Sequence, residues 1–156
     1  MKSYQGNDAY IAICFSTENR NAAEQIAAAL NAERFRVWGC KKGCRIREPE
    51  ERGRFASANT VMILISKEWL ADDDCILQLQ GAAKLEKPTV LLFLDGADFT
   101  GNSAIQAIVN RSMRMIDFDP QHTEECMAEL RDLTCITDCK MAPDEKPNVK
   151  KTGLFR

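Results

Sequence analysis

The stretch TVMILI at residues 60–65 is the part of the sequence that decides the fold. Apart from its first threonine it is apolar at every position, so both faces of the strand that it predicts are expected to be buried. Strands of this kind lie in the middle of parallel sheets, where helices cover both faces. The run TVLLFL at 89–94 has the same character, and Pro88 ends the helical stretch that separates the two.

Further strands and helices alternate on either side of these two runs. Residues 10–15 (YIAICF), 35–38 (FRVW) and 113–118 (MRMIDF) favour strands. Apolar residues at helical spacing predict helices at 22–30, 55–59, 67–86 (interrupted at most at 72–74), 105–109 and 126–133. This alternation predicts an α/β fold: a flavodoxin-like three-layer sandwich around a five-stranded parallel sheet.

Length and composition narrow the class of protein. The chain has 156 residues, about one domain, and its 45% of hydrophobic residues can form a core. Lys and Arg number 21 against 23 Asp and Glu, which argues against a nucleic-acid-binding protein. No stretch reaches the roughly 18 apolar residues of a membrane span. Residues 1–10 lack the apolar core of a secretory signal, so we expect a cytoplasmic protein with no membrane partner.

A change in composition near the end of the sequence sets the expected domain boundary. Residues 140–156 contain two prolines, four lysines and few apolar residues, which is typical of a tail or linker. Residues 1–139 are therefore predicted to form the domain and residues 140–156 a polar tail.

The cysteines are expected to be reduced thiols. There are seven of them, an odd number, and no secretory signal accompanies them. Cys14 and Cys75 are predicted to be small buried groups, and the others to be thiols of loops or of the tail. The pairs Cys40/Cys44 and Cys135/Cys139 have C-x-x-x-C spacing, whereas zinc sites usually have tighter C-x-x-C knuckles. We expect no metal.

A ligand site is expected at the carboxyl edge of the predicted sheet, because ligands of parallel sheets bind there. The segments at this edge are 15–19, 38–43, 66–69 and 95–98. The sequence has neither G-x-G-x-x-G after its first strand nor G-x-x-x-x-G-K-[ST], so these phosphate-binding motifs are absent. Residues 39–53 (GCKKGCRIREPEERG) combine glycines, a proline and dense charge, and they predict a long loop of the kind that often has a function.

Several segments, taken in order, resemble a Toll/interleukin receptor-like (TIR) domain of bacterial type. The most specific is SANTVMILISKEWLADDDC at 57–75, with small polar residues, an apolar strand, a serine, a short helical stretch and a cysteine. The segments that also take part in the resemblance are MKSYQGNDAYIAICFSTENR (1–20), FRVW (35–38) with the loop that follows it, KPTVLLFLD (87–95) and NSAIQAI (102–108). It covers about residues 4–137 and implies the TIR fold.

The resemblance also implies a nucleotide site with a changed catalytic position. Many TIR domains cleave NAD at the nicotinamide–ribose bond and rely on the glutamate of a C-x-x-E pattern, where this chain has Cys75 and Gln78. Cleavage develops positive charge on the ribose, and a nearby carboxylate stabilises that charge in the transition state. Glutamine has a similar shape and can hydrogen-bond ribose hydroxyls, but it has no charge.

Two more positions depart from the family pattern, because Asn19 and Cys40 stand where acidic residues are frequent. Gln78 is thus expected at the catalytic position in an inactive form. The residues expected to contact NAD are Phe15, Ser16, Asn19, Trp38, Cys40, Gly43, Ser66, Trp69 and Cys75. For Trp69 a place in the core is favoured over stacking on a ligand, and for Trp38 both are open.

Two functions follow from the resemblance. The first is a signalling or assembly module with a decayed NAD-cleaving site, which needs no cofactor and retains at most weak nucleotide binding. Its partners would be other TIR domains, met through the charged loop at 41–54. The alternative is an NAD glycohydrolase in which Gln78 is an engineered or compensated replacement. In that enzyme Glu18 or a carboxylate of the loop supplies the missing charge.

Overall fold

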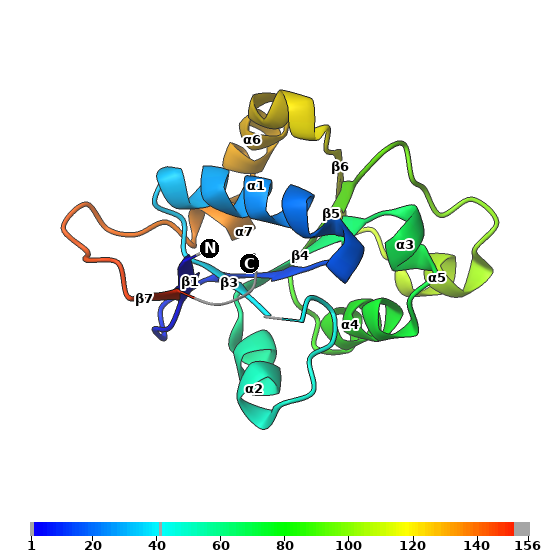
Figure 1. Ribbon diagram of the computed structural model, residues 1–156, viewed down its shortest axis with the longest axis horizontal. Coiled ribbons are helices and arrows are strands. Elements are labelled where there is room, and N and C mark those ends of the chain that lie inside the picture. The colour runs from blue at the N-terminus through cyan, green and yellow to red at the C-terminus, as the bar shows by residue number, and fades with distance from the viewer. Residues whose placement is uncertain (1, 41, 152–156) are drawn as a thin grey trace.

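A five-stranded parallel sheet forms the centre of the structure (Figure 1). The computed structural model describes residues 2–40 and 42–151. The strands lie in the order β3 (Val37–Gly39), β2 (Ile11–Cys14), β4 (Thr60–Ile65), β5 (Thr89–Phe93), β6 (Arg114–Asp117). Every neighbouring pair is parallel. This order and direction confirm the predicted flavodoxin-like α/β fold.

The two central strands, β4 and β5, are buried along their whole length. Successive side chains of a strand point to opposite faces, so each strand contributes to both of the layers that cover the sheet. In β4, Met62 and Leu64 enter one core cluster, whereas Val61, Ile63 and Ile65 enter the other. Burial of both faces of β4 therefore explains the continuous apolar pattern of residues 60–65, as the sequence indicated.

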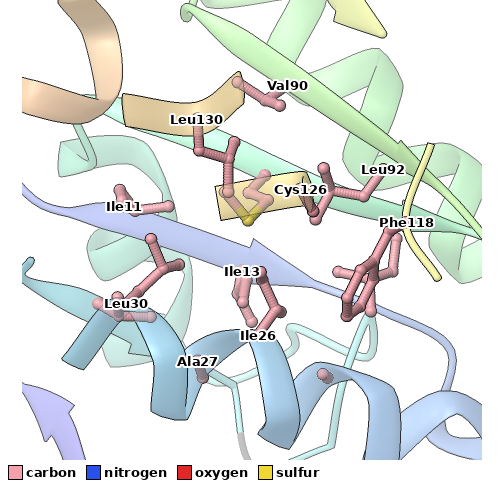
Figure 2. Packing of buried hydrophobic residues seen from close by; sticks show 14 of the residues in the cluster. Ile11, Ile13, Ile26, Ala27, Leu30, Val90, Leu92, Phe118, Cys126 and Leu130 are labelled. Atoms are coloured by element: carbon pink, nitrogen blue, oxygen red, sulfur yellow. The ribbon is translucent and has the colours of Figure 1, made fainter. Parts of the chain in front are cut away.

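One face of the sheet is covered by α1 (Arg20–Ala32), α6 (Thr123–Arg131) and α7 (Thr134–Thr137). Ile26, Ala27 and Leu30 of α1 pack in the same cluster as Ile11 and Ile13 of β2 (Figure 2). These α1 residues share one face of the helix, which confirms the amphipathic helix predicted at 22–30.

The other face is covered by α2 (Pro49–Ser57), α3 (Lys67–Leu70), α4 (Asp73–Lys84) and α5 (Ser103–Ile108). Phe55, Leu79 and Ile105 are their buried contacts, and Trp69 is fully buried among them. Two single turns of 3-10 helix, η1 (Thr17–Asn19) and η2 (Pro120–His122), precede α1 and α6. Within the described parts of the chain, no helix has the length and apolar character that crossing a membrane requires.

Helix α2 begins inside the segment 39–53 that was expected to be a loop throughout. Proline is well placed at the first position of a helix, and Glu48 at the N-cap forms a capping box with Glu51, the third residue of the helix. The helix ends at Ser57, so it also contains the start of the helix predicted at 55–59. The charge and the proline of this segment mark a helix start as well as a loop.

Two other helix predictions differ from the structure at their boundaries. The stretch 67–86 forms two helices, and the break lies close to the interruption allowed at 72–74, because Asp72 has an extended backbone and caps the second helix, which ends at Lys84. The helix predicted at 126–133 begins at Thr123, ends at Arg131, and is followed by α7.

A small antiparallel sheet joins the two ends of the described chain. β1 (Lys2–Tyr4) pairs with β7 (Val149–Lys151), and neither strand was predicted, since three partly polar residues give no clear pattern. The segment before β7 is held by Glu145, whose carboxylate accepts from Nε and Nη2 of Arg36 at 2.8 and 2.5 Å. Residues 140–151 of the expected tail thus lie against the domain. The boundary at residue 139 stays a prediction, and residues 152–156 lie outside the described part.

We predict that Glu145→Gln lowers the free energy of unfolding by about 1 kcal/mol, because it weakens a bidentate, charge-assisted pair that solvent partly screens. The hydrogen bond from Arg36 lowers the pKa of Glu145. The stabilisation is therefore present above the pKa of the unfolded carboxyl and is lost as the pH falls through the lower pKa of the folded state. Urea unfolding at neutral and at acidic pH measures both effects.

Asp144→Asn is the matched control, because Asp144 is an exposed carboxylate beside Glu145. If both variants lose the same stability, or Glu145→Gln loses none, the ion pair does not hold this segment to the domain.

Candidate functional site

A hollow of about 530 Å³ lies at the carboxyl ends of β2 and β4. This is the edge of the sheet at which the sequence predicts a ligand site. Its lining comes from the turn after β2, the loop after β3, and the segment from α3 to the start of α4: Ser16, Thr17, Glu18, Arg45, Glu68, Ala71, Asp72, Asp73 and Asp74.

A small polar network lies where β4 ends. Ser66 caps α3 by accepting a hydrogen bond from the Trp69 N–H at 3.0 Å, and its hydroxyl donates to Oδ1 of Asn19. A hydrogen bond from its own backbone N–H, with further contributions from Ser66 and Asn19, lowers the pKa of Glu68. Ser66 and Asn19, both predicted site residues, are thus brought together beside an ionised carboxylate.

The hollow is strongly acidic. Of the described residues that line it, five are carboxylates, and Arg45 carries a guanidinium. The acidic run 72–74 has a structural cause, because Asp72 accepts from the Asp74 N–H at 2.9 Å and acidic side chains stabilise a helix N-terminus. A lining of this charge repels an anionic group such as a pyrophosphate.

The loop after β3 is held against the end of β2 through its backbone. Gly43 has a φ of +63°, and a Cβ added there would lie 2.5 Å from the Phe15 carbonyl oxygen, so a side chain does not fit. The N–H of Cys44 donates to the same oxygen at 2.9 Å. Phe15 and Gly43 are therefore neighbours, and their contact is part of the packing of the loop.

Gln78 lies on α4 and is half-buried. Its Nε2 donates a hydrogen bond to the carbonyl oxygen of Cys44 at 2.9 Å. The same oxygen accepts from the Ile46 N–H at 2.9 Å, so two donors share this carbonyl. Gln78 is not among the residues that line the hollow, and its amide is turned to the loop.

The thiols nearest to this loop are poor nucleophiles. Burial raises the pKa of Cys14 and of Cys44, and the neighbouring Cys75 thiol raises that of Cys44 further. Burial, and then the Glu51 carboxylate that accepts a hydrogen bond from the thiol, raise the pKa of Cys40 to about 12. A protonated thiol is neither an effective nucleophile nor a metal ligand.

The expectation that the remaining cysteines are thiols of loops or of the tail was wrong for Cys126 and Cys135, which lie on α6 and α7. Cys40, Cys44 and Cys139 lie between elements, as expected, but they are buried, as is Cys126, and Cys135 is half-buried. All seven are unpaired. Within residues 2–40 and 42–151, no three His, Cys, Asp or Glu side chains are grouped so that they could hold a metal ion.

Most of the residues predicted to contact NAD have little surface to offer a ligand. Phe15, Trp69 and Cys75 are fully buried, and Trp38 and Cys40 at the end of β3 are 5% and 1% exposed. Apart from Phe15, these five residues belong to the core cluster under α2, α4 and α5. Of the nine predicted contact residues, Ser16 alone lines the hollow. The role of these nine residues in binding NAD stays a prediction.

Arg45 and the acidic run 72–74 were not among the predicted site residues. The signal that could have found the run is its place at a helix start soon after Ser66, which brings a helix N-terminus to the carboxyl edge. The predicted segment 95–98 lies elsewhere, because Asp95 and Gly96 line a separate hollow of about 400 Å³ beyond β5 and β6.

Comparison with known families supplies an independent finding. The chain matches the family model described as the TIR domain over residues 11–133. None of the curated proteins matches it. The matched range runs from β2 to the end of α6 and contains the whole parallel sheet, the hollow, the loop after β3 and Gln78. Since the match covers most of the sequence and agrees with the fold, the chain belongs to the TIR domain family.

Proposed function

We propose that this TIR domain is a signalling or assembly module whose NAD-cleaving site has decayed. The observation that carries this function is the state of position 78. The side chain there is a neutral amide, and it donates to the Cys44 carbonyl oxygen rather than lining the hollow at the sheet edge.

The chemistry of NAD cleavage explains why this position matters. The ribose gains positive charge as the bond to nicotinamide breaks. A group accelerates the reaction only if it stabilises this charge more than it stabilises bound NAD. An amide offers a dipole where a carboxylate offers a full charge, and the Gln78 amide is already engaged by Cys44.

The acidic hollow supports the same function, because its charge weakens the binding of NAD. The pyrophosphate of NAD would meet Glu18, Glu68 and the acidic run 72–74, and like charges brought together weaken binding. Among the described residues that line the hollow, Arg45 is the cation, and its Nε lies 3.8 Å from Oδ2 of Asp74, which Arg47 approaches at 3.2 Å. Both guanidinium groups thus face a carboxylate of the acidic run, which leaves little positive charge to hold the phosphates.

One observation favours the alternative of an active NAD glycohydrolase. Glu18 lines the hollow beside Ser16 and Thr17, so a carboxylate is present at this edge of the sheet even though position 78 lacks one. In such an enzyme the stabilising charge comes from the turn after β2, and Gln78 is compensated.

We predict that the purified domain releases no nicotinamide from NAD above the rate in buffer. Gln78→Glu is expected to stay inert, because the five carboxylates that line the hollow are still present. Chromatographic measurement of nicotinamide checks both. Gln80→Glu, at an exposed position of the same helix, adds the same charge as a control.

Two results would contradict this function. Turnover by the natural sequence that is abolished by Gln78→Ala or Glu18→Gln would favour the glycohydrolase. Strong activity of Gln78→Glu, but not of Gln80→Glu, would show that the rest of the pocket is intact and that the site has not decayed beyond one residue.

We further propose that the domain associates with other TIR domains through the charged segment 41–54, of which residue 41 lies outside the described residues and residues 49–54 belong to α2. Arg45 and Arg47 are 57% and 70% exposed, and both approach one partner, the Asp74 carboxylate, at 3.8 and 3.2 Å. Guanidinium groups and the acidic run 72–74 thus lie side by side on one surface. Such a surface is complementary to a second copy of itself, and salt weakens contacts of this kind.

We predict that Arg45→Glu combined with Arg47→Glu weakens self-association about tenfold, because cross-domain attraction becomes repulsion. Sedimentation velocity at about 50 and about 500 mM salt measures this, and the natural chain should dissociate at the higher salt. Arg111→Glu with Lys146→Glu makes the same change of charge at exposed positions elsewhere and should have no effect. A natural chain that stays monomeric at low salt would contradict the assembly role.

A further inference from the structure

We propose that Gln78 is a positioning residue that latches the loop 42–48 in the shape used for self-association. This assigns a role to the residue at the family's glutamate position that involves neither NAD nor catalysis. It rests on the proposed function, because the loop concerned is the one proposed to meet a second domain.

Cys44 is the point at which the loop is fixed. Its N–H donates to the Phe15 carbonyl oxygen, and its own carbonyl oxygen accepts from Nε2 of Gln78, each at 2.9 Å. Its side chain is 2% exposed and belongs to the core cluster of Trp38 and Cys75. The residue is therefore held by the end of β2, by helix α4 and by the core.

The contact at position 78 needs a hydrogen-bond donor. The amide of Gln78 has N–H groups to donate, whereas an ionised glutamate has acceptors alone. In Gln78→Glu, carboxylate oxygens would face the carbonyl oxygen of Cys44, so an attraction becomes a repulsion between partly buried oxygens. The glutamine therefore does more than remove a charge from position 78. It makes a hydrogen bond that a glutamate at this position could not make.

The latch controls where the charged groups of the loop lie. Arg45 is the next residue after Cys44, and Arg47 is the third. Their common partner Asp74 lies four residues before Gln78, one turn away on the same helix. Fixing Cys44 to α4 thus sets the direction in which both arginines leave the surface. A loop that is ordered before association loses less conformational entropy on binding, so the latch favours self-association.

Hydrogen–deuterium exchange of the full chain tests the latch itself. In Gln78→Glu the backbone amides of residues 42–48 should exchange about fivefold to tenfold faster than in the natural chain. The reason is that the N–H groups of Cys44 and Ile46 are hydrogen-bonded only while the loop keeps the shape that the structure shows. Alkylation of the buried Cys44 thiol by N-ethylmaleimide, located by mass spectrometry, should accelerate in parallel. The control Gln80→Glu should change neither rate.

A second variant guards against a general loss of folding. Gln78→Met keeps an unbranched side chain of similar size without the donor, and it should also free residues 42–48 while exchange in β4 and β5 stays slow. If residues 42–48 exchange at the natural rate in both variants, Gln78 does not latch the loop, and the inference fails.

Sedimentation of the same variants separates this inference from the proposed function. Weaker self-association in Gln78→Glu and Gln78→Met, with Gln80→Glu unchanged, supports the positioning role. If the loop opens but association is unchanged, while the double arginine variant still weakens it, the positioning role is overturned and the assembly function stands. If the natural chain does not associate at all, the positioning role falls with the assembly function, and the exchange data then describe only a local contact.

Discussion

Burial of both faces of the central strands is the constraint on which the rest of the structure depends. Every side chain of β4 and β5 is buried, so each face of the sheet must be covered by a layer of helices. Covering both faces requires the chain to cross over the sheet between parallel strands, and this brings the carboxyl ends of the strands to one edge. The hollow with Ser16 and Glu68, the cap at Ser66 and the loop after β3 all lie at that edge because of this topology.

Several polar groups at this edge are hydrogen-bonded to one another. Ser66 bonds Asn19 and the N-terminus of α3, Asp72 caps α4, and Gln78 bonds the Cys44 carbonyl. What is left open in the hollow is carboxylate, which suits neither a pyrophosphate nor a dinucleotide as a whole. The surface formed by Arg45, Arg47 and the acidic run 72–74 has both signs of charge and is suited to contact with another protein, as the proposed assembly role requires.

Strands buried on both faces and the amphipathic helix α1 could be predicted because their patterns are local and strong. The run at 60–65 became β4 without change of boundary, and the apolar positions of α1 are the ones that pack on the sheet. β1 and β7 could not be predicted, because three residues with mixed polarity become a strand only when a distant partner is present. The start of α2 was missed for a different reason: Pro49 and the charges around it are typical of loops and of helix N-termini alike.

The order of residues was enough to predict the fold class and the family, and it shows directly that position 78 lacks a carboxylate and that charge is concentrated in the segment after β3. These are properties of residue type and order, which do not depend on distant neighbours. The tertiary structure alone decided that Gln78 is turned to Cys44, that Trp38 and Cys40 are buried, and that the acidic run 72–74 shares a hollow with Glu18. A glutamine on a helix has the same local pattern whether it faces a ligand or a loop. Which of the two it meets is set by how α4 and the loop pack against the end of β2, and that depends on contacts between residues far apart in the chain.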